Sequence, residues 1–298
     1  MAPEGGRDGR CRVCASGDVR LFCRKDAARY LKCRACGLIF LETLPARERM
    51  RDHADDLYET GVYSDYVEAK GLKLEHFRRR LAQFGDRHPH GRLLDIGCSC
   101  GYFLEVALEN GYDAAGIEFS RAAIDAADPQ VRRRITRGNV NDLSSLGAEQ
   151  YDIVTAFDII EHTEDPVDFL RQARRLLKKG GCVVISTPDN GHFLRYLLGC
   201  RWPMLQPLQH TVLFSRKSLA LCLELAGFSG STFETAYKVV SLDYLFDQVR
   251  EYFPTTHKAY RFLSRGVRGG LLRKPRTLNI GEMLAVGSPA GALGRTLR

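Results

Sequence analysis

Two pairs of cysteines near the N-terminus have the spacing of metal ligands. Cys11 and Cys14 lie in "CRVC", Cys33 and Cys36 lie in "CRAC", and eighteen residues separate the pairs. Each knuckle places two thiolates on a tight turn, and together they complete a tetrahedron around Zn²⁺. Because cysteine fills all four positions, no coordination position stays open for catalysis. The spacing therefore predicts a structural zinc ribbon over residues 11–45.

A second group of residues reads as a strand, a small-residue turn and the start of a helix. In "RLLDIGCSCGYFLE" (92–105), an apolar run ends at Asp95, and small residues follow at positions 97, 99 and 101. Such a turn presents backbone N–H groups to a nucleotide. A dinucleotide site requires a third glycine where this chain has Tyr102, and a carboxylate beside a pyrophosphate would repel it. The stretch therefore favours a ligand with a cationic group.

The elements that position this turn alternate along the chain. From Arg92 onward, apolar runs alternate with amphipathic helices, which is the pattern of a parallel α/β sheet. Strands are expected at "RLLDIG", "DAAGIEF", "RRRITRG", "YDIVTAFD", "GCVVISTP", "GSTFETA" and "GEMLAVGSP". Helices are expected at "YFLEVALENG", "SRAAIDAAD", "PVDFLRQARRLLKKGG" and "SRKSLALCLELAGF".

Composition and segment boundaries complete the picture of a globular chain. Of the 298 residues, 44% are hydrophobic and 27% are charged. No apolar run reaches ~18 residues and the N-terminus lacks an apolar leader, so we expect a cytoplasmic protein without a membrane span. Ten cysteines in such a chain favour metal binding and free thiols over disulfides. We expect disorder over 1–10, a helical linker and cover over 46–90, and an α/β domain over 91–298 with a helical insert at about 241–275.

The turn at Asp95 resembles the D-x-G-x-G-x-G motif of class I S-adenosylmethionine-dependent methyltransferases, with Ser99 at the middle glycine. The resemblance implies a Rossmann-like α/β sheet with helices on both faces, here preceded by the zinc ribbon, and S-adenosylmethionine as cofactor. Glu118 lies near the end of "AAGIEF", at the tip of the second strand, where a carboxylate can accept both ribose hydroxyls. "RGNVNDL" resembles the adenine-contacting segment, and the Asp158 region of "FDIIEHTEDP" resembles the motif that faces the methionine amino group and the transferred methyl. The cofactor-binding residues implied in this way are Asp95, Gly97, Cys98, Gly101, Glu118, Phe119, Asn139, Asp142 and Asp158.

A narrower resemblance is to a bacterial group that joins a zinc ribbon to this domain. The matching stretches are "CRACGLIF", "STPDNGHFLRYLLGCRWPMLQPLQHTVLFS" and "GEMLAV", and the resemblance covers nearly all of residues 11–287. Members of the group methylate small molecules, often sugars. The resemblance implies a small-molecule acceptor such as a sugar, a glycolipid or a polyketide-type metabolite.

Transfer to a hydroxyl requires removal of the acceptor's proton, and an imidazole is a natural base. We choose His210, because it lies in the loop after the fifth strand, on the side where parallel sheets bind ligands. The alternative for His210 is a capping or core histidine. The expected lining of the acceptor pocket is Tyr63, Tyr66, His192, Trp202 and Gln209, although aromatic residues are also core filler.

Two alternatives concern the chemistry of the same site. Asp158, Glu161 and His162 form D-x-x-E-H, which resembles the E-x-x-E-H metal site of ubiquinone-pathway O-methyltransferases and suggests Mg²⁺. Related sugar C-methyltransferases carry Tyr-x-Glu-His where this chain has Pro-Leu-Gln-His at 207–210. That departure favours oxygen over carbon as the acceptor atom.

Other readings concern partners. The net charge is +8, and residues 261–276 contain six basic residues and no acidic one. This basic segment forms a solvated surface, contacts an anionic membrane or, in an RNA methyltransferase, binds the phosphates of the RNA. Nucleic acid is the less expected partner, because the chain lacks a [D/N/S]-P-P-[Y/F] signature at 186–190. A non-catalytic module that binds cofactor without turnover is a further alternative.

Overall fold

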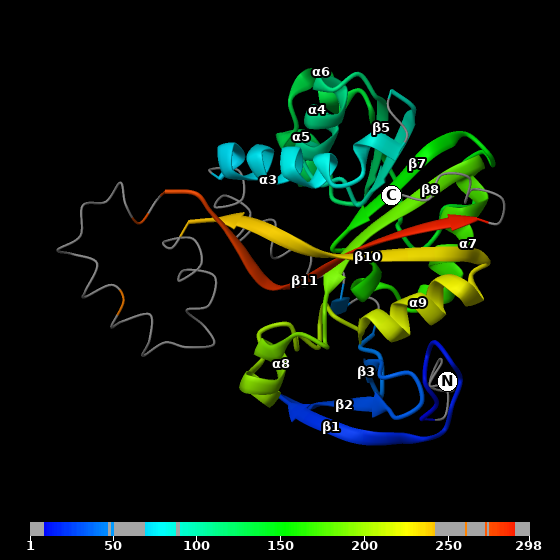
Figure 1. Cartoon of the computed structure of the whole chain (residues 1–298), viewed down its shortest axis with the longest axis vertical. Helices are drawn as coiled ribbons and strands as arrows, with labels where there is room; N and C mark the ends of the chain where they lie inside the picture. Colours follow the sequence, from blue (N-terminus) through cyan, green and yellow to red (C-terminus); the bar gives the residue numbers. More distant parts are fainter. Residues whose placement is uncertain are drawn as a thin grey trace.

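Two β-sheets form the described part of the chain (Figure 1). The computed structural model describes residues 9–46, 49–50, 69–87, 90–241, 260, 272 and 274–289. Tyr63 and Tyr66 lie outside these residues, as do nearly all of the predicted disordered N-terminus, helical insert and basic segment.

The larger sheet has seven strands in the order β10-β11-β8-β7-β4-β5-β6. Strands β4 to β8 run parallel, whereas β11 pairs antiparallel with β8 and β10 antiparallel with β11. The bounds are β4 (Arg92–Ile96), β5 (Asp113–Glu118), β6 (Ile135–Arg137), β7 (Tyr151–Phe157), β8 (Leu177–Pro188), β10 (Phe228–Val240) and β11 (Arg276–Pro289). This order confirms the predicted Rossmann-like α/β architecture.

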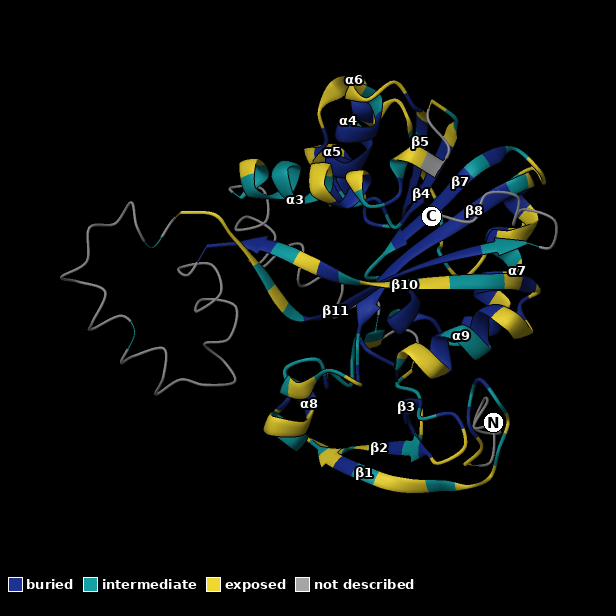
Figure 2. Ribbon diagram, in the orientation of Figure 1, coloured by how far each residue is buried: buried dark blue, intermediate teal, exposed yellow. Residues whose placement is uncertain are grey.

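Helices cover both faces of this sheet, because alternate residues of its central strands point to opposite faces (Figure 2). Leu93 of β4 packs in the hydrophobic cluster that contains residues of α3 (Lys70–Ala82) and α4 (Tyr102–Glu109). Leu94 packs in the cluster that contains residues of α7 (Pro166–Leu176) and α9 (Arg216–Leu225). The shorter helices are η1 (Gly85–Arg87), α5 (Arg121–Ala126), α6 (Pro129–Arg132), η2 (Ile160–His162), α8 (Phe193–Leu198) and η3 (Gly199–Arg201).

The smaller sheet belongs to the ribbon and has the order β1-β2-β3-β9. Its strands are β1 (Val19–Lys25), β2 (Ala28–Cys33), β3 (Ile39–Leu41) and β9 (Val212–Leu213). Strand β9 comes from the chain after η3, so the main domain supplies one strand of the ribbon's sheet. Phe40 of β3 also belongs to the same hydrophobic cluster as Phe214 and Leu219. The ribbon is thus packed onto the domain that carries α7 and α9.

One element differs from its prediction at its end. The helix expected to run through "LLKKGG" stops at Leu176, and β8 begins at Leu177, which pairs with Tyr151. Gly180 has a φ of 86°, which an α-helix cannot contain. The lysines that resembled a helix end therefore lie at the start of a strand.

Candidate active site

The candidate site lies at the carboxyl ends of the parallel strands β4, β5 and β7. Asp95 of β4 is 3% exposed, and its Oδ1 accepts a hydrogen bond from Thr155 Oγ1 at 2.6 Å. Burial raises the pKa of Asp95 to about 7, although the hydrogen bond from Thr155 opposes this shift. A buried carboxylate without a cation is costly to ionise, so this position suits a ligand with a positive charge.

The turn after β4 needs its glycines. Gly97 and Gly101 both have a φ of 75°, and Ser99 between them has a φ of 52°. Glycine tolerates this left-handed region without a steric cost. A Cβ at Gly97 would lie 2.1 Å from Ile159 Cδ1, and one at Gly101 would lie 2.4 Å from Val131 Cγ1. Larger residues at these two positions would push the turn away from the sheet edge.

Glu118 ends β5 with its carboxylate fixed by two backbone groups. Ser99 N–H donates to Oε2 at 2.9 Å, and Ser120 N–H donates to Oε1 at 2.8 Å. Burial raises the pKa of Glu118, and these N–H groups oppose the shift. Each carboxylate oxygen accepts more than one hydrogen bond, so both can still receive a hydroxyl. The geometry therefore suits a vicinal diol such as a ribose.

The remaining predicted cofactor residues are placed less directly. Cys98 Sγ faces the sheet, because a Cβ on Gly116 would lie 2.5 Å from it. Phe119 is half-buried and follows Glu118. Asn139 and Asp142 are exposed in the loop after β6, where each side chain accepts a backbone N–H two residues ahead. Their contacts with an adenine stay predictions.

Asp158 follows β7 directly and has a φ of 56°, which is uncommon for a residue with a side chain. Its Oδ1 accepts a hydrogen bond from Ser186 Oγ at 3.0 Å, and its Oδ2 lies 3.1 Å from Lys238 Nζ. The Asp158 side chain is 42% exposed, so a ligand can reach it. The structure thus places a lysine at the carboxylate for which the sequence predicts the methionine amino group.

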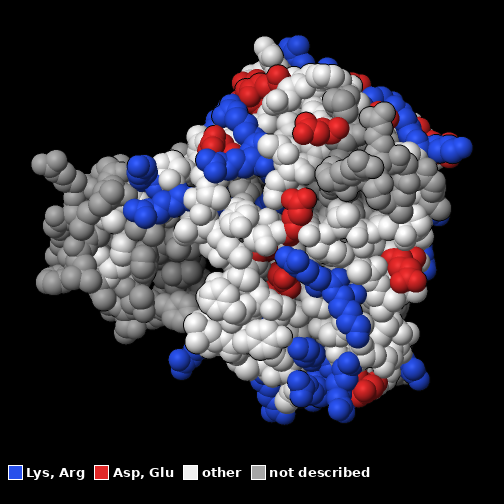
Figure 3. Space-filling view, in the orientation of Figure 1, with Lys and Arg blue, Asp and Glu red and all other residues white. Residues whose placement is uncertain are grey.

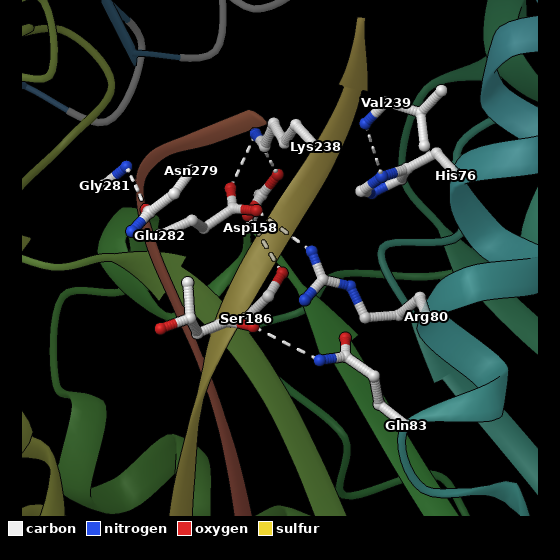
Figure 4. A network of polar contacts seen from close by, with 11 residues as sticks. His76, Arg80, Gln83, Asp158, Ser186, Lys238, Val239, Asn279, Gly281 and Glu282 are labelled. Carbon is white, nitrogen blue, oxygen red and sulfur yellow. Dashed lines mark hydrogen bonds and ion pairs between the residues drawn. The ribbon is translucent and has the colours of Figure 1, made fainter. Parts of the chain in front are cut away.

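Lys238 belongs to a network of four charges (Figure 4). Its Nζ lies 2.6 Å from Glu282 Oε1, and Arg80 Nη2 donates to Glu282 Oε2 at 3.0 Å. Arg80 comes from α3, Lys238 from β10 and Glu282 from β11. Burial alone lowers the pKa of Lys238, but Asp158 and Glu282 outweigh it and raise the pKa above its ordinary value. The two carboxylates therefore favour the charged form of Lys238.

Two imidazoles and a buried carboxylate lie beside this network. His210 Nδ1 is 2.7 Å from Met204 O, and His162 Nδ1 is 3.0 Å from Gln209 O. Because a carbonyl accepts, each Nδ1–H donates, and the neutral His210 ring keeps its lone pair on Nε2. Burial and the neighbouring His162 lower the pKa of His210 to about 3.

Glu161, His162 and His210 also have the donor types of a divalent-cation site. One ligand atom from each lies within 4.8 Å of the others, and Glu161 is 1% exposed. Two imidazoles with one carboxylate are ligands that Zn²⁺ and Fe²⁺ accept. The predicted D-x-x-E-H grouping is altered, because Asp158 is engaged by Lys238 and His210 takes the third place.

The predicted acceptor-lining residues lie in different surroundings. His192 is the N-cap of α8 and packs against Gly281, whose added Cβ would meet its Nδ1 at 2.8 Å. Trp202 is 3% exposed and packs with Tyr30 and other apolar residues under the ribbon, which is the position of a core residue. Gln209 is half-buried, and its carbonyl receives the hydrogen bond from His162.

The four predicted zinc ligands converge. Their sulfur atoms all lie within 4.8 Å of one another. Cys11 Sγ is 3.6 Å from Cys36 Sγ, and Cys14 Sγ is 3.5 Å from Cys33 Sγ. Tetrahedral Zn–S bonds of ~2.3 Å place sulfur atoms ~3.8 Å apart, so the cluster fits a zinc ion.

Sequence reasoning missed Thr155, Arg80, Lys238 and Glu282. Glu282 gave a signal, because it is an acidic residue inside the apolar closing strand "GEMLAV". Arg80 lies among three consecutive arginines of a charged helix, and Lys238 lies in a strand with polar and apolar neighbours. Nothing in those two patterns distinguishes them from solvated residues.

Comparison with known proteins agrees with this geometry. The family described as "Methyltransferase domain" matches residues 66–231, more than half of the chain. An enzyme named ubiquinone biosynthesis O-methyltransferase from Alkalilimnicola ehrlichii is 32% identical over 138 residues, which are 44% of this chain and 54% of that protein. One of the same name from Cereibacter sphaeroides is 32% identical over 158 residues, 48% of this chain and 64% of that protein. The chain spans about half the length of the first of these relatives.

A solved structure shows the same fold. The S-adenosylmethionine-dependent methyltransferase from Archaeoglobus fulgidus superposes with a TM-score of 0.51 at 18% identity, covering 74% of this chain and 98% of that one. Within the described residues, no helix is long and apolar enough to cross a membrane. On the match over residues 66–231, this chain belongs to the methyltransferase-domain family, and its fold is that of the S-adenosylmethionine-dependent enzymes.

Proposed function

We propose that this chain transfers a methyl group from S-adenosylmethionine to an oxygen of a small-molecule acceptor, of the sugar, glycolipid or polyketide type. The observation that carries the proposal is the convergence of Asp95, Glu118 and the 97–101 turn at one edge of the sheet. The names of the curated relatives support oxygen as the acceptor atom. A structural zinc ion in the four-cysteine cluster is part of the proposal.

Each strand end takes one part of the cofactor. The Glu118 carboxylate, held by two backbone N–H groups, receives the ribose hydroxyls. Asp95 and the turn face the methionine part, where the cofactor's positive charge offsets the cost of ionising a buried carboxylate. The exposed loop with Asn139 and Asp142 covers the adenine. S-adenosylmethionine itself supplies an activated methyl group on a sulfonium, so the chain needs to align the acceptor and to manage its proton.

His210 is the proposed general base. Its Nδ1–H is committed to Met204 O, which leaves the Nε2 lone pair for the acceptor's proton. The low pKa keeps the ring neutral at neutral pH but also makes it a weak base. Transfer to an alcohol therefore requires a second group that stabilises the acceptor oxygen.

The alternative role for His210 is to bind a divalent cation together with Glu161 and His162. Metal analysis of the purified protein separates the two roles. A second equivalent of metal that Glu161→Gln and His210→Ala both remove, while the four cysteines stay loaded, would support the cation. A single zinc per chain that both variants retain would support the free base.

The cofactor half of the proposal is tested by calorimetric titration of S-adenosylhomocysteine. Micromolar binding to the wild type, weakened about tenfold or more in Glu118→Ala, is expected, because ~1.4 kcal/mol corresponds to a factor of ten. Glu109→Ala is the matched control, since Glu109 pairs with Arg78 on the exposed surface. Absence of binding to folded wild-type protein would exclude the enzyme and favour a non-catalytic module.

A further inference from the structure

The Lys238 ammonium lies beside Asp158, directly after β7, in the region that the sequence resemblance assigns to the transferred methyl group. We propose that Lys238 is a further catalytic residue, whose ammonium donates a hydrogen bond to the acceptor oxygen and stabilises the negative charge that develops there. The inference rests on the proposed methyl transfer to oxygen and names a group that this transfer uses.

One N–H donor of the Lys238 ammonium remains for a ligand. A lysine ammonium has three N–H donors. Asp158 Oδ2 and Glu282 Oε1, at 3.1 and 2.6 Å, take two of them. The Lys238 side chain is 30% exposed, so a ligand can reach the third donor. The Asp158 side chain, which follows β7, is also open to solvent.

The surrounding network holds this cation in one place. Arg80 and Glu282 have side chains that are 1% and 4% exposed, and their ion pair fixes the Glu282 carboxylate. The carboxylates of Glu282 and Asp158 then both contact the ammonium (Figure 4). A donor fixed in advance stabilises developing charge without reorganisation at the moment of reaction. Arg80 and Glu282 are thus positioning residues.

Lys238 also complements His210. The His210 ring lies 4.9 Å from that of His162, which follows Asp158 by four residues, and Asp158 contacts Lys238, so the base and the cation lie at the same sheet edge. A neutral imidazole is a far weaker base than an alkoxide, so it removes a hydroxyl proton poorly on its own. A hydrogen bond from an ammonium to the same oxygen favours its ionised form and lowers the barrier to that proton transfer.

The step balances with these two residues. The hydroxyl proton passes to His210 Nε2, while the oxygen forms the new bond to the methyl carbon. The carbon–sulfur bond breaks, and its electron pair stays on sulfur, which becomes a neutral thioether. The imidazolium then returns its proton to water. Lys238 keeps all its protons throughout.

A test that needs no acceptor compares ligands that differ at the reacting centre. S-adenosylhomocysteine has a neutral sulfur there, whereas sinefungin has an amine that is protonated. A cation within ~6 Å of that amine repels it, so Lys238→Gln should raise the affinity for sinefungin relative to S-adenosylhomocysteine about fivefold or more. Lys238→Arg keeps the charge and should keep the wild-type ratio. Calorimetric titration of both ligands into each variant gives the ratio.

Lys178→Met is the matched control, because Lys178 Nζ lies 2.7 Å from Asp152 Oδ2 in a similarly exposed pair at the start of β8. This control should leave the ratio unchanged. An equal change in both affinities in Lys238→Gln, or no change, would overturn the location of the cation. Lys238→Met provides a second neutral variant if Lys238→Gln fails to fold. Failure of S-adenosylhomocysteine to bind the wild type would instead overturn the proposed function.

The hydrogen bond itself is tested with 4-nitrophenol, whose absorbance reports its ionisation. It is titrated into the wild-type complex with S-adenosylhomocysteine at a pH where the free probe is mostly protonated. Binding as the phenolate in the wild type and in Lys238→Arg, but as the phenol in Lys238→Gln, is the expected result. Binding as the phenol in the wild type, or no binding, would overturn the oxyanion role.

Discussion

The cysteine cluster and the Asp158 network are both compact groups of polar side chains, but they assemble differently. The outermost cysteines are 25 residues apart in the chain, and two short knuckles bring all four together. Arg80 and Glu282 are 202 residues apart, and four separate elements must be in place before their network exists. The first group is readable from spacing, whereas the second is a product of the completed sheet.

The largest effect is expected when the four-cysteine cluster is broken. Cys36→Ser leaves three thiolates, and a structural zinc contributes ~10–16 kcal/mol of apparent binding energy to a small metal domain. We expect loss of one zinc per chain and a large fall in the melting temperature, because Cys33 and Cys36 share a hydrophobic cluster with the main domain. Elemental analysis with thermal denaturation measures both. Cys200→Ser, at an exposed cysteine, should retain zinc and stability.

The next largest effect is expected when the Asp158 network is broken at Arg80. Arg80→Met leaves Glu282 with one cation, and removal of one partner from a buried ion pair costs about 3–5 kcal/mol. Arg78→Met is the control on the same helix, because the Arg78–Glu109 pair has a similar 3.1 Å distance but is nearly half exposed. Exposed pairs contribute ~0–1 kcal/mol. Equal losses in urea denaturation of the two variants would mean that the network adds nothing to stability.

A third test concerns Asp95, at the sheet edge proposed to bind the cofactor, and measures how folding stability depends on pH. The folded pKa of Asp95, at about 7, lies above its ordinary value of 3.8, so the folded state holds a proton that the unfolded state has lost. Its contribution to stability is therefore present below about pH 4 and is lost as the pH rises to about 7. The unfolding free energy of Asp95→Asn relative to the wild type should rise by ~3 kcal/mol over that window. Asp125→Asn, at an exposed residue, is the control, and a parallel pH profile for Asp95→Asn would contradict the shift.

The smallest expected effect concerns the capping box of α9, which, like the cysteine spacing, is encoded by residues close together in the chain. Ser215 and Ser218 form a capping box at the start of α9, with Ser215 Oγ accepting from Ser218 N–H at 3.3 Å. Ser215→Ala should cost ~1 kcal/mol, which is typical of a lost N-cap. Chemical denaturation against Ser229→Ala, at an exposed residue of β10, measures the difference. A negligible loss would show that packing of α9, rather than its cap, sets where the helix begins.

The features that could be predicted from the sequence are again those encoded by neighbouring residues, and the ones missed depend on contacts between distant elements. The positions of β4, β5 and β7 and the carboxylates at their ends were predictable, because apolar runs and turns are encoded within a few residues. The end of α7 was not, since β8 competes for Leu177 through its pairing with Tyr151. The ion-pair partner of Asp158 was not predictable, because Lys238 comes from a strand 80 residues away. Trp202, expected in the acceptor pocket, lies in the core under the ribbon, because β9 brings its loop against β3.

The sequence by itself determined the cysteine site, the left-handed turn at Gly97 and Gly101, and the order of strands that puts Asp95 and Glu118 at one edge. These features depend on short-range spacing and on backbone conformations that few residues adopt. Tertiary structure alone decided that Arg80, Asp158, Lys238 and Glu282 meet, that His210 faces His162, and that the ribbon shares a sheet with β9. The physical reason is that a charge is stable in the interior only beside its partners, and those partners are fixed by how the sheet closes.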